Sequence, residues 1–168
     1  SAINYNANGN QNIADGFNYG SLYISGSGQK IAKSDMTIKG KIWRQGGTSI
    51  FYDGGYTHYV AGDWLLVAAG YTRQSATGTI VLNGINQHIS YGNNLTCFNN
   101  LVIAGTGTTI MDGNDSIFGN LTIDDGSKLD GDNRTIWIEG NWNNSGTGIF
   151  THLTGTVCFV NKLANQTI

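Results

Sequence analysis

The chain repeats itself at a spacing of about 78 residues, and this recurrence limits the possible folds more than any other feature, because a fixed period is typical of repeat architectures. Three segments recur one such spacing later: LYISGSGQKI (22–31) as LVIAGTGTTI (101–110), VAGDW (60–64) as IEGNW (138–142), and GTIVLNGINQHI (78–89) as GTVCFVNKLANQTI (155–168). A third copy of the last segment opens the chain as INYNANGNQNI (3–13).

We therefore predict one solenoid segment over residues 1–168. It comprises two units, roughly 14–89 and 90–168, and a partial unit at 1–13. The chain stops at Ile168, where its own pattern calls for another coil. We expect these residues to be a window of a longer continuous solenoid.

A finer period appears inside each unit. In the second unit, apolar centres lie near Val102, Leu121, Ile138 and Val157, with apolar and polar residues alternating around them and turn-forming residues after them. This alternation predicts short strands with one buried face. A strand and turn that recur at about 20 residues are typical of a chain coiled upon itself. We predict an all-β parallel β-helix of about eight coils, four to each unit.

The composition agrees with stacked coils. Gly, Asn and Thr fill 62 of the 168 positions (25, 20 and 17), and proline is absent. Gly and Asn accept the left-handed backbone angles of tight corners, and a missing proline leaves every backbone N–H free to pair with a neighbouring coil. A β-sandwich is the alternative fold. It explains the alternation but not the long-range recurrence.

Composition also excludes several classes of protein. The chain is 39 % hydrophobic, too apolar for disorder, and Glu139 is its only glutamate, too few for a coiled coil. Nine Lys and Arg residues with a pI near 5.8 argue against nucleic acid as a partner. The longest strictly apolar run, 64–69, is too short for membrane insertion.

Three segments carry a resemblance to a known family: FNNLVIAGTG (98–107), FGNLTIDDGSKLDG (118–131) and IWIEGNWNNSGTGIF (136–150). They resemble the repeats of very large secreted surface proteins of Bacteroidota-type bacteria, which read F-x-N-L-x-I-x-G, G-N-L-x-I, G-N-W-x-N-x-G-x-F and G-x-V-x-F-x-G. The match covers most of 98–168 and is looser over 17–89. It implies a right-handed β-helix in an exported adhesin or filament, often a client of type IX secretion.

The resemblance implies a structural segment at the cell surface, a rigid stalk whose partners are further copies of the repeat or neighbouring filaments. The charge distribution is uneven, because 30–44 carries five basic residues against Asp35, whereas 112–132 carries six Asp against Lys128. Staggered contact between neighbouring filaments is one interpretation of this contrast, and chance together with solvation is the other. Similar β-helices also include polysaccharide-degrading enzymes, which need clustered carboxylates and a base. The only adjacent acidic pair is Asp124-Asp125, with no histidine near it in sequence, so we predict no enzyme.

Calcium is the one cofactor that the sequence leaves open. Acidic residues crowd 112–132, and calcium favours carboxylates on turns. The candidate ligands are Asp112, Asp115, Asp130 and Asp132. Their spacing lacks the complete calcium loop, so solvated turn residues are the other interpretation.

Glycan binding is the alternative function. Tyr52 and Tyr56 flank Asp53-Gly-Gly55, a turn signal, and exposed aromatic rings stack on sugar faces. Packing within an enlarged turn is the competing role for both rings. Separately, Asp115-Ser116-Ile117 resembles the short O-glycosylation acceptor motif of Bacteroidota, which makes Ser116 a candidate modification site.

The chain has two cysteines, Cys97 and Cys158, which lie far apart in the sequence. Their spacing fits no metal or redox motif. Two free thiols and one disulfide both remain open from the sequence.

Overall fold

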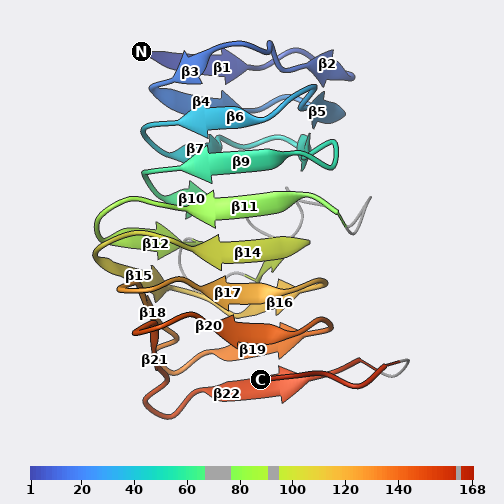
Figure 1. Cartoon of the computed structure of the whole chain (residues 1–168). Helices are drawn as coiled ribbons and strands as arrows, with labels where there is room; N and C mark the ends of the chain where they lie inside the picture. The colour runs from blue at the N-terminus through green and yellow to red at the C-terminus, as the bar shows by residue number, and fades with distance from the viewer. Residues whose placement is uncertain (67–76, 91–94, 162–163) are drawn as a thin grey trace.

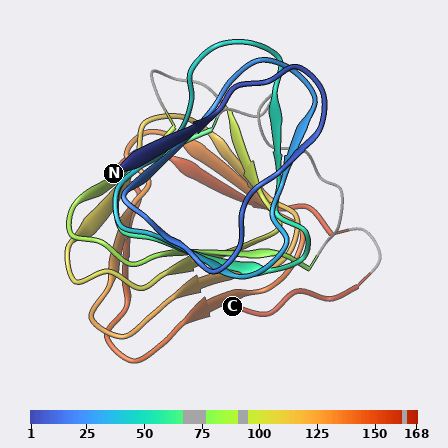
Figure 2. The ribbon, with the colours of Figure 1, turned by 90° about the horizontal axis from the view of Figure 1, so that it is seen from above.

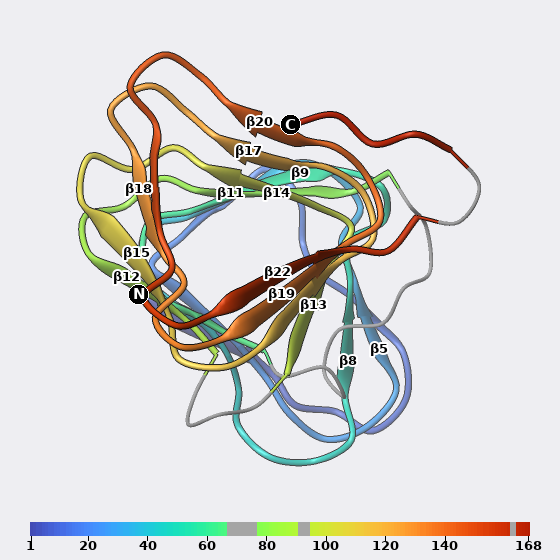
Figure 3. The same ribbon diagram turned by 90° about the horizontal axis from the view of Figure 1, so that it is seen from below.

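The structure is a computed structural model that describes residues 1–66, 77–90, 95–161 and 164–168. These residues form a stack of about seven turns of chain, each turn passing along three sides (Figures 1 to 3). All strand pairs in the described residues are parallel, so the fold is a parallel β-helix and not a β-sandwich. No helix in the described part of the chain is long and apolar enough to cross a membrane.

Two sheets run the length of the stack. The eight-stranded sheet contains, in order, β1 (Ala2–Tyr5), β4 (Ser21–Ile24), β7 (Ile42–Arg44), β10 (Trp64–Leu65), β12 (Gln87–Ile89), β15 (Thr108–Met111), β18 (Lys128–Asp130) and β21 (Ile149–Thr151). The seven-stranded sheet contains β3 (Asn18–Tyr19), β6 (Met36–Ile38), β9 (Thr57–Val60), β11 (Thr79–Leu82), β14 (Asn100–Ile103), β17 (Leu121–Ile123) and β20 (Trp142–Asn144).

The third side changes midway along the stack. A three-stranded sheet of β2 (Gln11–Asn12), β5 (Gln29–Ile31) and β8 (Ile50–Tyr52) forms it in the N-terminal half. A four-stranded sheet of β13 (Thr96–Phe98), β16 (Asp115–Ile117), β19 (Thr135–Ile138) and β22 (Thr156–Phe159) forms it in the C-terminal half. Seen from the N-terminal end the chain winds clockwise as it recedes, and seen from the other end it winds anticlockwise as it approaches (Figures 2 and 3). The solenoid is therefore right-handed.

The predicted length of one turn, about 20 residues, is correct, but the assignment of strands to turns is wrong. In the described residues, turns such as β4–β5–β6 and β15–β16–β17 carry strands on three sides rather than one strand and one turn. Val102 and Leu121 lie in the seven-stranded sheet, whereas the next predicted centre, Ile138, lies in the four-stranded sheet. The step from Leu121 to Ile138 is therefore a move to a different side, not one full coil.

The two copies of the long repeat also lie on different sides. Leu22 belongs to the eight-stranded sheet, and its copy Leu101 belongs to the seven-stranded sheet. One unit thus spans about three and two-thirds turns rather than four coils. Pairs such as Ile80 with Leu101 continue the ladder across the predicted unit boundary at 89–90.

Aliphatic columns fill the interior. Ile38, Val60, Leu82, Ile103 and Ile123 pair in register along the seven-stranded sheet, and all five are fully buried. One turn alone leaves such residues in water. Stacking removes them from water, and each fully buried Val, Leu or Ile contributes about 1.5–3 kcal/mol.

Repeated glutamines fasten one turn to the next. Gln87 accepts a hydrogen bond from the Gly84 N–H (2.6 Å), and its Nε2 donates to the carbonyls of Val60 (2.9 Å) and Gly62. Gln166 makes the same contacts with the Asn161 N–H and with the carbonyls of Ile138 and Gly140. We call this arrangement the glutamine clamp. It explains why NQ in one segment recurs together with the GDW or GNW of another.

The two cysteines do not pair. Cys97, Ser116, Trp137 and Cys158 lie in register on successive strands of the four-stranded sheet, and both thiols are free. Three strand spacings separate Cys97 from Cys158, about 14 Å, whereas a disulfide requires Cα atoms about 4.4–6.8 Å apart. Of the two interpretations of the cysteines, the free thiols are correct.

Candidate functional site

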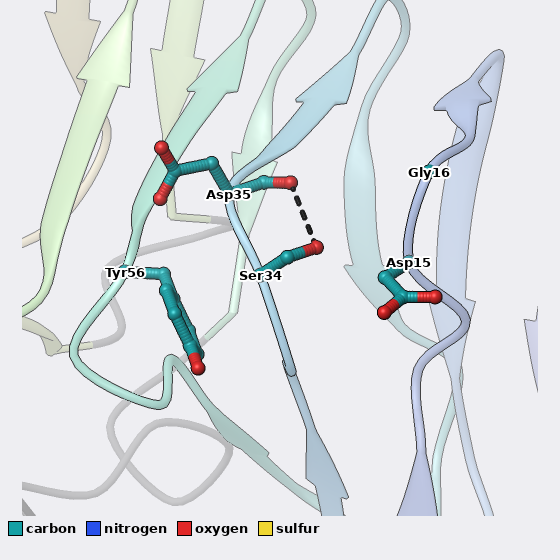
Figure 4. A pocket seen from close by; sticks show the side chains of 5 residues that line it. All are labelled: Asp15, Gly16, Ser34, Asp35 and Tyr56. Carbon is teal, nitrogen blue, oxygen red and sulfur yellow. Dashed lines mark hydrogen bonds between the residues drawn. The ribbon is translucent and has the colours of Figure 1, made fainter.

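A surface groove of about 660 Å³ crosses three turns at the corner between the three-stranded and seven-stranded sheets (Figure 4). Its walls are, turn by turn, Asp15 and Gly16, then Ser34 and Asp35, then Tyr56. The strands that follow are β3, β6 and β9, which pair in register. Corner residues of successive turns are therefore stacked at about 4.8 Å, and the groove extends about 10 Å along the solenoid axis.

Two tyrosine hydroxyls hold the backbone next to Asp15. The Ala14 N–H donates to the Tyr5 hydroxyl (2.9 Å), and the Tyr19 hydroxyl donates to the Ala14 carbonyl. Tyr19 is fully buried, and burial raises its pKa well above the ordinary value, with further contributions from Tyr5 and from the charge of Asp15. Tyr19 thus stays a neutral donor, and the two tyrosine hydroxyls fix the backbone at Ala14, directly before Asp15.

Asp35 is fixed by the turn that follows it. Its Oδ1 accepts the Thr57 N–H (2.9 Å), and the Ser34 hydroxyl donates to the Asp35 carbonyl (3.2 Å). Within the described residues the other carboxylate oxygen has no hydrogen-bond partner, and the same is true of both carboxylate oxygens of Asp15. The groove therefore offers acceptor oxygens from two adjacent turns.

Tyr56 forms the third wall. It follows Gly54 and Gly55, whose φ angles of 66° and 82° lie in the left-handed region that favours glycine. A Cβ at Gly54 would meet the Ala32 carbonyl oxygen at 2.5 Å and the Tyr56 ring at 2.8 Å, so the ring rests against a backbone that only glycine permits. Tyr56 is 38 % exposed.

Tyr52, the other predicted glycan contact, is not part of the groove. It is half-buried in β8 and follows the buried Phe51. The four other lining residues are absent from the predicted site. A signal for them exists, because the step from Asp15 to Asp35 matches one turn of the solenoid and each aspartate lies in a turn signal.

A buried polar cluster surrounds Asp53, which lies in the same turn as Tyr56. Asp53 accepts hydrogen bonds from the Gly55 N–H (2.8 Å) and from Asn99 Nδ2 (2.7 Å), and His58 Nε2 donates to the Asp53 carbonyl (2.9 Å). His58 is fully buried, and desolvation lowers its pKa, so its ring is neutral. These contacts shape the turn and leave His58 no access to a ligand.

The four calcium candidates do not converge. Asp115 faces the core, whereas Asp112 is partly exposed and accepts a hydrogen bond from His88 Nδ1 (2.9 Å). Asp130 accepts the N–H of Asp132 within its own turn (3.0 Å). In the described ranges no group of three or more His, Cys, Asp or Glu side chains could hold a metal. The calcium prediction therefore gains no site from these residues.

In the predicted acidic pair Asp124-Asp125, Asp125 links two turns. Asp125 Oδ1 accepts the N–H (2.8 Å) and hydroxyl (2.7 Å) of Thr147 one turn away. These bonds lower the pKa of Asp125, because they favour its charged form. Ser116, the modification candidate, is half-buried on the outer side of β16, while the aspartate of its motif points inward.

Two residues of the predicted charge contrast are buried. Lys30 is fully buried, and its Nζ donates to the carbonyls of Ala7 (2.8 Å), Gly9 (3.1 Å) and Ser27 (2.8 Å). Asp115 is likewise buried. The surface charges of 30–44 and 112–132 are still opposite in sign, but one basic residue and one aspartate fewer contribute to them.

Comparisons of this chain with protein-family models, curated proteins and solved structures found no match.

Proposed function

We propose that this chain is a structural segment of a secreted cell-surface filament or adhesin, in which the solenoid is a rigid stalk and its outer faces are adhesive. The observation that supports this is the continuity of the ladders along the axis, with one aliphatic column buried from Ile38 to Ile123. The two termini lie at opposite ends of the stack (Figure 1). Such a segment lengthens any chain that contains it.

Stiffness follows from the direction of the backbone hydrogen bonds. In a parallel solenoid these bonds run along the axis, so bending separates several of them in every turn. The eight-stranded sheet has seven strand spacings, which give a rod about 34 Å long. Partners of the stalk would be further copies of the repeat or neighbouring filaments, with no role for nucleic acid or membrane insertion.

Distance measurements between spin labels test the stalk. Labels replace the exposed Asn12 in the first turn and Thr156 in the last, in a chain with Cys97 and Cys158 changed to alanine. A rigid stalk gives one narrow distance distribution. A broad or multimodal distribution, with the fold intact by circular dichroism, would contradict the proposal.

Surface location needs its own test. An antibody raised against residues 1–168 should label intact source cells as strongly as permeabilised ones. Label that appears only after permeabilisation would rule out display at the cell surface.

A glycan-binding module is the second candidate. The groove lined by Asp15, Gly16, Ser34, Asp35 and Tyr56, which we call the Tyr56 groove, supports it. Wild type and Tyr56→Ala are compared on a glycan array, with Tyr59→Ala as the matched control because Tyr59 is similarly exposed (42 %) and does not line the groove. Binding that Tyr56→Ala alone removes supports this function. If no glycan on the array binds the wild type, the glycan-binding function is rejected. A polysaccharide-degrading enzyme is less well supported, because Asp125 is engaged by Thr147.

A further inference from the structure

Two asparagines of the chain are followed directly by glycine, Asn8 and Asn83. An asparagine before glycine can cyclise, because glycine has no side chain to hinder attack of its backbone nitrogen on the side-chain carbonyl carbon of the asparagine. Asn8 and Gly9 are both exposed, and a Cβ at Gly9 would meet nothing within 4 Å. The first of the two sites therefore leaves room for a ring to close.

One hydroxyl group contacts both reacting groups at this site. The Gly9 N–H donates to Ser27 Oγ (3.2 Å), and the Ser27 hydroxyl donates to Asn8 Oδ1 (3.3 Å). Because a serine hydroxyl accepts and donates at the same time, Ser27 forms a path for a proton from the attacking nitrogen to the oxygen of the attacked carbonyl. Ser27 belongs to the next turn of the solenoid, so stacking is what brings it to this peptide.

The backbone on both sides of the Asn8–Gly9 peptide is anchored from inside. Lys30 Nζ donates to the carbonyls of Ala7 (2.8 Å) and Gly9 (3.1 Å), and Lys30 is fully buried. Lys30 Nζ also donates to the Ser27 carbonyl (2.8 Å). The same ammonium group thus holds the reacting peptide and the turn that supplies the hydroxyl against each other.

The second site lacks this proton path. The Gly84 N–H donates to Oε1 of Gln87 (2.6 Å), a residue that is 1 % exposed. That oxygen belongs to an amide and has no proton to pass on to Asn83. Gly84 is also tightly packed, because a Cβ there would meet the Ala61 carbonyl oxygen at 1.9 Å. The fold therefore favours cyclisation at Asn8 and opposes it at Asn83.

We propose that Asn8 is a self-modification site, which converts to aspartate and isoaspartate through a cyclic imide with Ser27 as the proton relay. The Gly9 nitrogen attacks Asn8 Cγ while its proton passes through Ser27 to Oδ1, which leaves a tetrahedral carbon that bears a hydroxyl and an amino group. The hydroxyl re-forms the carbonyl, and its proton leaves with the amino group as ammonia. Water then opens the imide. Cleavage of the Cγ–N bond gives aspartate, and cleavage of the backbone C–N bond gives isoaspartate.

Peptide mapping of the 168-residue chain tests the site. The protein is incubated at neutral pH and body temperature, and the mass increase from amide to acid is followed at both asparagines. In the folded chain Asn8 should convert, at least as fast as in the chain unfolded by guanidinium chloride, whereas Asn83 should keep its amide. In the unfolded chain both should convert at the same rate. Folded-state conversion of Asn8 that is no faster than that of Asn83 would overturn the proposal.

Variants of Ser27 test the relay. Ser27→Ala should slow the conversion of Asn8 in the folded chain by about fivefold, the rate effect of one hydrogen bond lost from a transition state. Ser27→Thr keeps the hydroxyl and should retain the wild-type rate. Ser25→Ala is the matched control, because it removes a hydroxyl of the same corner that donates to Asn4 Oδ1 (3.2 Å), and it should not alter the rate at Asn8.

The unfolded chains complete the test. The wild type and the three variants should convert Asn8 equally in guanidinium chloride, since the relay exists only between stacked turns. An unchanged or faster rate in folded Ser27→Ala would reject the relay, as would a loss in Ser27→Ala that persists in the unfolded chain. If folded wild type converts Asn8 more slowly than unfolded wild type, the fold protects Asn8 and the proposal is wrong.

Discussion

At the scale of single residues, Asp115 is the clearest conflict between sequence and surroundings. It occupies a core position of β16, in register with Thr96 and Ile136, and is 1 % exposed. Within the described chain both of its carboxylate oxygens lack a hydrogen-bond partner. Desolvation, and secondarily the charge of Asp112, raise its pKa well above the ordinary 3.8. The folded protein therefore carries this carboxyl in its neutral form.

This raised pKa predicts how stability depends on pH. The folded state keeps the Asp115 proton when the unfolded state has lost it. The contribution to the free energy of unfolding is therefore fully present below about pH 3.8 and is lost as pH rises through the folded pKa. Asp115→Asn removes this dependence. Urea unfolding from pH 4 to 8 should show wild type losing at least about 1 kcal/mol relative to the variant.

Asp124→Asn, a partly exposed carboxyl, is the control for this measurement and should follow the wild-type profile. Parallel profiles for wild type and Asp115→Asn would show that Asp115 does not titrate as inferred.

The glutamine clamps give a second prediction, a ranking. Gln87 is 1 % exposed and makes three hydrogen bonds, Gln166 makes three but is partly exposed, and Gln11 makes one, with the Ala7 N–H, in the described residues. Gln87→Ala should cost about 2–3 kcal/mol, because it strands buried partners, and Gln166→Ala about 1 kcal/mol. Gln11→Ala should change least. Urea midpoints check the order, and equal losses at Gln87 and Gln11 would contradict it.

At the scale of elements, asparagine side chains continue the ladder outside the strands. Asn100 Oδ1 accepts the Asn120 N–H (2.9 Å), Asn120 Oδ1 accepts the Asn141 N–H (2.8 Å), and Asn141 Oδ1 accepts the Thr167 N–H (3.0 Å). We call this row the asparagine ladder. These are the asparagines of FNNL, FGNL and EGNW, so the recurring motif has a structural reason at the start of β14, β17 and β20.

Removing one member of the asparagine ladder should loosen its neighbour. Asn120→Ala takes away the acceptor for the Asn141 N–H, so hydrogen exchange at Asn141 should speed up while the protection of Ile138 is retained. Asn120 and Asn141 are both exposed, so water substitutes for the lost partner, and global stability should fall by only about 0.5–1 kcal/mol. Asn143→Ala, an exposed asparagine outside the row, should leave the exchange at Asn141 unchanged. Unaltered exchange in Asn120→Ala would contradict the role of the ladder.

At the scale of the whole molecule, the strands of each turn pair only with strands of the turns directly before and after it, and the Asn99–Asp53 hydrogen bond reaches one turn further. Stability in such an array is a sum of neighbour contacts, so opening begins at the ends. We predict graded amide protection, greatest in β11, β14 and β17 and least in β1 and β22. Hydrogen exchange at several urea concentrations checks this gradient. Uniform protection throughout the stack would show one global unfolding unit instead.

Alternation, turn residues and the long-range recurrence were enough to predict a parallel β-helix, because an apolar side chain at every second position has to be buried and stacked repeats bury it. The turn signal Asp53-Gly-Gly55 was also enough to predict an exposed aromatic ring beside it, and Tyr56 is that ring. The aspartates Asp15 and Asp35 were less accessible, since a turn residue carries no local sign of what the next turn places beside it.

Sequence by itself determined the class of fold, the approximate length of a turn and the residues of its corners. Only the tertiary structure decided which side each strand occupies, because a unit of about three and two-thirds turns rotates its copies onto different sheets. It also decided that Asp115 lies inside and Asp112 outside, and that Tyr56 lines the same groove as Asp35 whereas Tyr52 does not. Such contacts join residues on stacked turns, and their register is set by the packing of the whole column rather than by neighbours in the chain.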